Sequence, residues 1–218
     1  MKRITEPELM EDETQVLAYA NADFSEAHNH FIALIQKQIV TDQMSEIVLE
    51  LGCGSGDITQ RFAETFPQCV VDAVDGSQTM LNFAAHRLPL HLQQRVNFYS
   101  LLLPAIHFPK PRYQAVFSNS LLHHLHNPNT LWESLKQVVN PGGMVFIMDL
   151  IRPDSISEAK QLVYDYASGE PEILQTDFYN SLLAAFSIPE IRQQLNRVGL
   201  ELSVEQVTHR HVFIAGKI

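Results

Sequence analysis

Short apolar runs alternate along the chain with longer segments in which apolar residues recur at helical spacing. The first pattern is typical of strands buried on both faces of a sheet, and the second is typical of amphipathic helices. The expected strands are residues 47–51, 70–74, 96–99, 113–118, 144–149, 201–207 and 211–216. The expected helices are residues 13–40, segments beginning at 57 and 77, and residues 129–139, 155–168, 177–186 and 189–198. This alternation predicts an α/β fold with a mostly parallel sheet covered by helices on both faces.

Residues that break or end helices and strands refine this assignment of elements. The helical region at 13–40 is expected to break near Asn21–Ser25, and NPGG at 140–143 is a turn signal. Gly199 is well placed to end the last helix. No linker or repeat interrupts the chain, so we expect a single domain over residues 1–218. Its expected segments are an N-terminal helical cap at 1–40, a core at 46–150, a helical substrate-side insertion at 151–190 and an edge hairpin at 200–218.

A glycine-rich turn follows the first expected strand. Residues 48–59 read VLELGCGSGDIT, in which an apolar strand runs into glycines and then into a helix start. The glycines are Gly52, Gly54 and Gly56. This arrangement brings a small ligand against bare backbone, and Asp75 at the end of the next strand is placed to bind two ribose hydroxyls. Asp57 stands where a dinucleotide fingerprint requires glycine, and its charge disfavours a pyrophosphate at that helix start. The loop therefore predicts a nucleoside ligand without phosphate.

Composition and charge narrow the class of partner. The chain has a formal net charge of −10 and no Lys/Arg cluster longer than a pair, which argues against nucleic-acid binding. It has no apolar stretch long enough for a membrane span and no signal-peptide pattern at its start. Cys53 and Cys69 do not have a metal-type spacing, and reduced thiols fit a cytoplasmic protein.

Four blocks in order carry a resemblance to a known family. They are ELGCGSG at 50–56, VDAVDGSQTML at 71–81, YQAVFSNSLLHHL at 113–125 and LKQVVNPGGMVFIMDL at 135–150. In these blocks the chain resembles a class I S-adenosylmethionine-dependent methyltransferase of the small-molecule type. The resemblance implies S-adenosyl-L-methionine as cofactor and a doubly wound Rossmann-like sheet of seven strands in the order 3-2-1-4-5-7-6, with the last strand antiparallel. It also implies an O or N acceptor on a small molecule, and a monomer or homodimer. The alternatives are a non-catalytic S-adenosylmethionine-binding or scaffold protein and a protein or tRNA methyltransferase.

The resemblance also implies the cofactor-binding residues. They are Glu50, Gly52, Cys53, Gly54, Gly56, Asp75, Gly76, Met80, Leu101, Leu102, Ser118 and Asn119. Glu50 either holds the methionyl amino group or only braces the loop, Asp75 either binds the ribose or only caps a helix, and Met80 packs either on adenine or in the core. The chain departs from the family after the third strand, where Leu101 and Leu102 stand in place of the usual acid.

The acceptor side is less defined by the sequence. The expected catalytic residues are His123, Tyr19 and Asp23, and the expected substrate residues are His124, Asp149, Arg152, Tyr164 and Phe178. Either histidine can instead be structural, Asp149 and Arg152 can simply pair with each other, and Asp23 can cap a helix. The N-terminal segment to Phe24 is expected to fold over the cofactor as a lid. The HHLH sequence is not a ligand spacing that makes a metal site on its own, so no metal is predicted.

Overall fold

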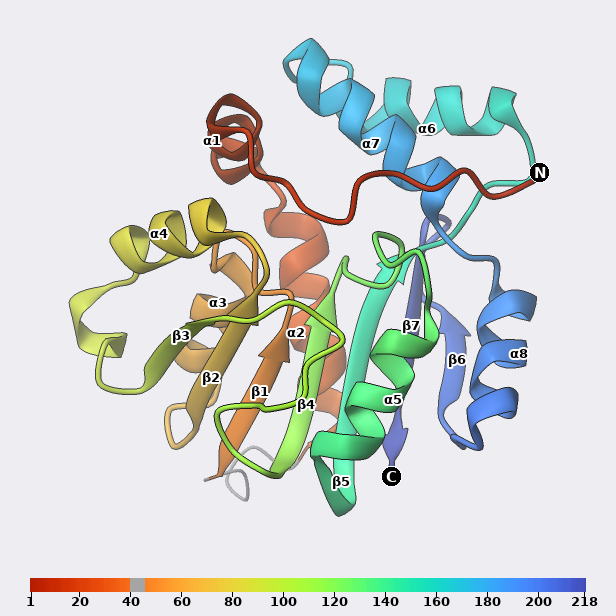
Figure 1. The fold of residues 1–218 in the computed structure, drawn as a ribbon. Coiled ribbons are helices and arrows are strands. Elements are labelled where there is room, and N and C mark those ends of the chain that lie inside the picture. Colours follow the sequence, from red (N-terminus) through yellow and green to blue (C-terminus); the bar gives the residue numbers. More distant parts are fainter. Residues whose placement is uncertain (40–45) are drawn as a thin grey trace.

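The computed structural model describes residues 1–39 and 46–218, so Val40, the last residue of the expected N-terminal cap, lies outside the described residues. The described strands form one sheet in the order β3-β2-β1-β4-β5-β7-β6, as the sequence predicts (Figure 1). They are β1 Ile47–Leu51, β2 Val70–Asp75, β3 Val96–Ser100, β4 Tyr113–Asn119, β5 Val139–Leu150, β6 Ser203–Gln206 and β7 His211–Lys217. Strands β1 to β5 are parallel, whereas β7 runs antiparallel to both β5 and β6.

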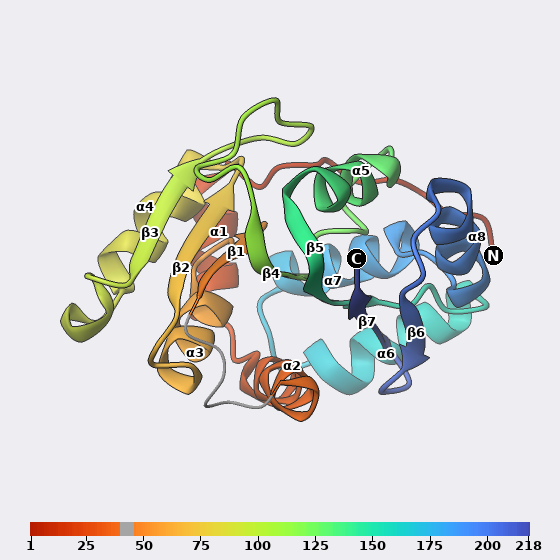
Figure 2. The same ribbon diagram turned by 90° about the horizontal axis from the view of Figure 1, so that it is seen from below.

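Helices cover both faces of the sheet. They are α1 Glu13–Asn21, α2 Ser25–Gln38, α3 Asp57–Thr65, α4 Gln78–Arg87, α5 Asn129–Val138, α6 Ile156–Ala167, α7 Glu172–Ala184 and α8 Ile188–Val198, with a short 3-10 turn η2 at Leu90–Leu92. The core on one face joins α2 and α3 to the strands through Phe31 and Phe62. The core on the other face joins α5 and α8 through Trp132 and Leu195. Seen along the strands, the two sets of helices lie on opposite sides of the sheet (Figure 2).

Two boundaries differ from the sequence prediction by five residues, for physical reasons. Strand β5 begins at Val139 rather than residue 144, because Val139 already pairs with Tyr113 before the register shifts. The expected turn at 140–143 is thus an irregularity inside the strand, where Gly142 has a φ of 78°. Helix α7 begins at Glu172 rather than residue 177, directly after Pro171, because proline suits the start of a helix and not its interior.

The carboxyl end of the sheet is covered by α1, α6, α7 and the N-terminal segment. Residues 1–12 form no regular element and cross above the strand ends from α7 toward α4 (Figure 1). Their position is fixed by bonds to distant residues, such as Arg3 Nη2 donating to the carbonyl of His123 at 2.8 Å and Ile4 N–H donating to Leu183 at 3.0 Å. Within the described part of the chain, no helix is long and apolar enough to cross a membrane.

Candidate active site

The glycine loop between β1 and α3 has a backbone that few other residues could adopt. Gly52 and Gly54 both have positive φ, at 71° and 50°. A Cβ added to Gly52 would lie 2.9 Å from Leu121, whereas a Cβ added to Gly54 would meet no atom within 4 Å. The loop is therefore packed tightly at its start and open at Gly54, so a ligand can approach the backbone there.

Asp75 links this loop to the next helix. Its Oδ2 accepts a hydrogen bond from Gly54 N–H at 2.8 Å, and its Oδ1 accepts one from Ser77 N–H at 2.8 Å. Burial raises the pKa of the Asp75 carboxyl, although hydrogen bonds from Ser77, Gly54 and Gly76 act in the opposite direction. Asp75 thus supports the start of α4, as the capping alternative expects, and also the glycine loop. Contact with a ribose stays a prediction.

Glu50 is a buried carboxyl at the end of β1. Its side chain is nearly inaccessible, at 1 % exposed, and Oε2 accepts a hydrogen bond from Thr59 Oγ at 2.5 Å. Burial raises the pKa of Glu50 to about 8, because a charged carboxylate is costly where water cannot reach it. A cation placed beside this group would favour its ionised form, which suits a ligand that carries an ammonium group.

These groups line a first cavity at the carboxyl ends of β1 and β2. Most of the predicted cofactor residues lie in its wall, namely Glu50, Gly52, Cys53, Gly54, Asp75, Gly76, Met80, Leu101, Leu102 and Asn119. Two do not. Gly56 is the residue from which α3 starts, and Ser118 is buried with its hydroxyl donating to the carbonyl of Leu51 at 2.7 Å.

The N-terminal segment closes one side of the first cavity. Glu8, Leu9 and Met10 are part of its wall. The carbonyl of Met10 accepts a hydrogen bond from Ser77 Oγ at 2.7 Å, which ties the segment to the start of α4. The sequence did not single out Leu9, and a lid that folds over the cofactor stays a prediction.

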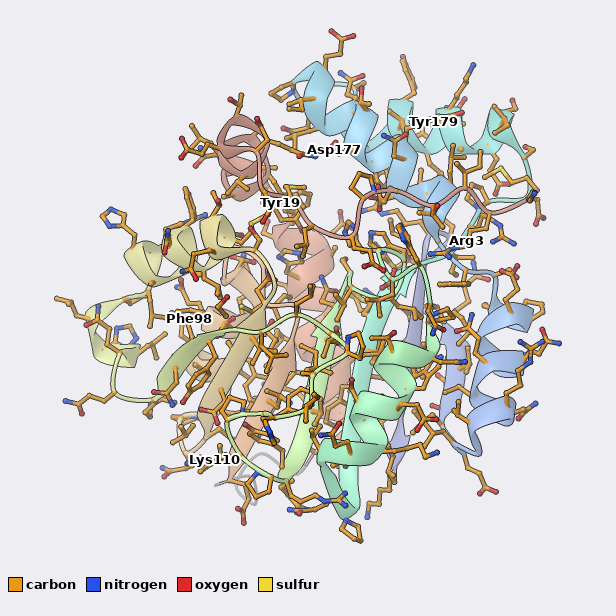
Figure 3. The ribbon with its side chains drawn as sticks, in the orientation of Figure 1. Arg3, Tyr19, Phe98, Lys110, Asp177 and Tyr179 are labelled. Atoms are coloured by element: carbon orange, nitrogen blue, oxygen red, sulfur yellow. The ribbon has the colours of Figure 1, made fainter. Side chains whose placement is uncertain are left out.

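A second cavity adjoins the first on the side of α6 and α7. The two share six wall residues, which are Met10, Tyr19, His28, Asn119, Ser120 and His124. The second cavity also includes Asp177, Phe178 and Arg210. Figure 3 shows Tyr19 and Asp177 above the carboxyl end of the sheet, whereas Lys110 lies at the opposite end. The two cavities therefore border each other along this shared wall.

The predicted acceptor residues separate into two groups. His123, His124, Tyr19, Asp23 and Phe178 line the second cavity. Asp149, Arg152 and Tyr164 do not: Tyr164 is 69 % exposed, and Arg152 pairs with Glu190 at 2.7 Å. Asp149 bonds to His123 instead, so Asp149 and Arg152 do not pair with each other.

Tyr19 and Asp23 are four residues apart, but they do not lie on one helix. Helix α1 ends at Asn21, and Asp23 accepts a hydrogen bond from Ser25 N–H at 2.9 Å at the start of α2. Asp23 therefore acts as the capping alternative expects. Tyr19 packs on Phe24, with ring centroids 4.8 Å apart, and burial raises its pKa to about 12.

The two adjacent histidines have opposite electrostatic environments. Burial lowers the pKa of His123, but the Asp149 carboxylate, 2.6 Å from His123 Nδ1, outweighs burial and the net shift is upward. Burial and the neighbouring His123 lower the pKa of His124 to about 3. His123 is therefore a buried imidazole paired with Asp149, and His124 is a neutral imidazole in the wall of both cavities.

The sequence analysis did not identify several of the residues that line the two cavities. Ser120 joins both cavities with a φ of 55°, a conformation that serine seldom adopts and that no sequence pattern revealed. Arg210 and Asp177 come from the β6–β7 turn and from α7. Only the folding of the last third of the chain over the sheet brings these two residues to the site.

Comparison with known proteins agrees with this geometry. A methyltransferase-domain model matches residues 49–145. Malonyl-[acyl-carrier protein] O-methyltransferase of Halalkalibacterium halodurans is 26% identical over 195 residues, covering 84% of this chain and 70% of that protein. Trans-aconitate 2-methyltransferase of Methylobacterium nodulans is 26% identical over 168 residues, covering 75% of this chain and 61% of that protein.

The fold has a close counterpart among solved structures. A SAM-dependent methyltransferase from Aquifex aeolicus superposes with a TM-score of 0.71 at 18% identity, covering 96% of this chain and all of the other. In its sheet order, its glycine loop and these matches, the chain is similar to class I S-adenosylmethionine-dependent methyltransferases.

Proposed function

We propose that this methyltransferase acts on an oxygen or nitrogen of a small polar molecule held in the second cavity. The observation that carries the proposal is a set of buried side-chain atoms without a hydrogen-bond partner. Within the described residues these atoms are Asn119 Oδ1, His124 Nδ1, Asp177 Oδ2 and Arg210 Nη1, and all four residues line the second cavity. Buried polar atoms without partners are costly, so a polar ligand that pairs with them explains their presence.

The first cavity fits the cofactor. The open side of Gly54 leaves room for a ligand against the loop, the buried Glu50 carboxyl suits the methionyl ammonium, and Asp75 lies beside the loop where ribose hydroxyls are expected. S-adenosylmethionine supplies a methyl group already activated by its positively charged sulfur. The protein therefore has to position the acceptor and exclude water, rather than activate the methyl group.

The shared wall of the two cavities performs the positioning. Asn119, Ser120 and His124 border both cavities, so they are placed to orient an acceptor atom toward the methyl group. Tyr19, on α1, also borders both cavities and excludes water from them. His123 already holds a proton against Asp149, so it orients the acceptor rather than accepting a proton from it.

The far end of the second cavity selects the acceptor. Arg210 offers a guanidinium to an anionic or carbonyl group, and Asp177 offers a carboxyl oxygen to a hydroxyl or amine. Gln15 holds the other oxygen of Asp177 at 2.9 Å, which fixes the orientation of that side chain. A small molecule with an acceptor group at one end and a donor group at the other satisfies both residues.

Transfer of a radioactive methyl group tests the proposal. The protein is incubated with methyl-labelled S-adenosylmethionine and, separately, with the small-molecule and macromolecular fractions of a cell extract. We expect label to enter only the small-molecule fraction. Label that enters protein or RNA instead would overturn the proposed acceptor class, and no transfer to either fraction would favour a non-catalytic binding protein.

Matched variants connect the transfer to the second cavity. Arg210→Gln and Asp177→Asn should reduce transfer at least tenfold, while calorimetry shows an unchanged affinity for the cofactor. Arg197→Gln and Asp165→Asn change the same residue types at exposed sites on α8 and α6, and should behave as the wild type. Equal transfer by all four variants would remove the second cavity from the acceptor site.

A further inference from the structure

Three side chains from distant parts of the chain point their ligand-type atoms at one another. Glu6 Oε1 lies 3.6 Å from His123 Nε2 and 3.2 Å from His124 Nδ1. All three atoms lie within 4.8 Å of one another, and no other group of this kind occurs in the part of the chain that the structure describes. None of these approaches has hydrogen-bond geometry, so the three atoms lie close together without bonding to one another.

The surrounding contacts leave these atoms free to act as ligands. Asp149 Oδ1 lies 2.6 Å from His123 Nδ1, which assigns the proton to that nitrogen and leaves Nε2 for another partner. Ser181 Oγ donates to Glu6 from 3.1 Å, which holds the carboxylate toward the histidines. His124 Nδ1 is buried and has no hydrogen-bond partner. A carboxylate that orients a histidine is the usual second layer of a metal site.

We propose that Glu6, His123 and His124 bind a divalent transition-metal ion. Two imidazoles and one carboxylate form a donor set that suits zinc, iron, cobalt or nickel, whereas magnesium and calcium prefer oxygen ligands alone. The carboxylates of Glu6 and Asp149 supply two negative charges at the site, and Arg3, which donates to the carbonyl of His123, adds one positive charge nearby. Two of the ligands belong to the HHLH sequence, which makes no metal site on its own, and the third, Glu6, lies more than a hundred residues earlier in the chain.

The position of the site gives the ion a role. His123 and His124 line the second cavity, and three protein ligands leave a coordination position open, as in catalytic rather than structural zinc sites. An oxygen or nitrogen of the acceptor fills that position. The ion also ties the N-terminal segment, through Glu6, to the loop after β4, so the segment closes over the sheet more firmly when metal is bound.

Metal titration of the purified protein is the direct test. The chain is treated with a chelator, dialysed into metal-free buffer and titrated calorimetrically with zinc and, separately, with magnesium. We expect one zinc ion per chain, no comparable binding of magnesium, and a zinc-dependent rise in the midpoint of thermal unfolding, because a ligand that binds only the folded state stabilises it. Cobalt should give the visible absorption of a nitrogen- and oxygen-bound ion.

Variants identify the ligands. Glu6→Gln and His124→Gln should abolish the zinc site, and Ser181→Ala should weaken it about 10- to 100-fold, the usual effect of removing an orienting partner. His86→Gln removes an exposed histidine on α4 and controls for adventitious surface binding. Circular dichroism and cofactor titration of each variant report whether the fold and the first cavity are intact. Zinc binding that is absent in the wild type, or equal in Glu6→Gln and His86→Gln, would overturn the site while leaving the proposed methyl transfer untouched.

Discussion

The backbone N–H of Gly54 donates to Asp75 Oδ2 at 2.8 Å, which joins the open point of the glycine loop to the acid that ends β2. Two features that the sequence separates by 21 positions are thus one structural unit. The same carboxylate receives the Ser77 N–H at the start of α4. Any change at Asp75 therefore affects the loop and the helix start together.

Asp75→Ala should weaken cofactor binding by about 1.5–3 kcal/mol, the scale of hydrogen bonds to a charged group. The loss combines the expected contact with the ribose hydroxyls and the support that Asp75 gives to the loop. Calorimetry with S-adenosylmethionine measures it, and Asp165→Asn on the exposed face of α6 is the control. An unchanged affinity in Asp75→Ala would remove this residue from the cofactor site.

Gly54→Val should give a folded protein that no longer binds the cofactor, because the branched side chain would occupy the space into which the loop opens. Gly142→Val is a matched control: Gly142 also has positive φ and open space around its Cβ position, but it lies in the β4–β5 bulge. Both variants should lose about 1–2 kcal/mol of folding stability through the left-handed backbone. Thermal shift with and without cofactor separates the two effects, and a cofactor response in Gly54→Val equal to that of Gly142→Val would contradict the loop assignment.

The buried carboxyl of Glu50 predicts that the folding stability of the free protein depends on pH. Burial raises the pKa of Glu50 from 4.5 to about 8, so the folded state holds a proton that the unfolded state releases. The stability of the free protein should therefore fall as pH rises from about 4.5 to 8 and then level off. Glu50→Gln has no ionisable carboxyl at this position. Its stability relative to the wild type should therefore increase as pH rises through this range. Chemical denaturation at a series of pH values measures the difference, and parallel curves for the two proteins would show that Glu50 ionises normally.

The buried pair of His123 and Asp149 predicts a stability window. The pKa of His123 is raised, so its contribution is full below about 6.5 and is lost as pH rises through the raised value. The pKa of Asp149 is lowered, so its contribution is present above about 3.8 and is lost as pH falls through the lowered value. The pair is therefore most stabilising between these two limits.

Asp149→Asn should destabilise the protein by about 3–5 kcal/mol within that window, the usual effect of breaking a buried charge pair. Urea unfolding near pH 5.5 measures the loss. Glu133→Gln removes an acid that pairs with Lys136 on the surface of α5, and should change stability by no more than about 0.5 kcal/mol. A loss of stability in Asp149→Asn no larger than in this control would show that His123 and Asp149 do not form a buried charge pair in solution.

Substitution of Tyr19 and of Tyr164 tests which aromatic residues line the acceptor site. Tyr19 borders both cavities, whereas Tyr164 is 69 % exposed on α6 and borders neither. Tyr19→Ala should lower the rate of methyl transfer at least tenfold by admitting water and loosening the acceptor, while Tyr164→Ala should transfer at the wild-type rate. The initial rate of label transfer measures both, and a loss in Tyr164→Ala alone would restore the sequence-based assignment of Tyr164.

The local pattern of the chain determined the sheet and the cofactor loop. Apolar strands, a glycine turn and an acid at the end of β2 are features of short segments, and parallel strands bring their carboxyl ends to one edge. The predicted strand order therefore agrees with the described fold, and ten of the predicted cofactor residues line its first cavity, where contact with the cofactor stays a prediction. Each of these features depends on residues close in sequence or on pairing that a family resemblance implies.

Only the tertiary structure decided the acceptor side. Glu6 meets His123 because the N-terminal segment crosses the sheet, and Arg210 reaches the same region because β7 returns along β5. Asp149 meets His123 rather than Arg152, because a strand end and the neighbouring loop face each other across the sheet edge. Contacts between segments this far apart depend on how whole elements pack, and side-chain spacing along the chain contains no record of that packing.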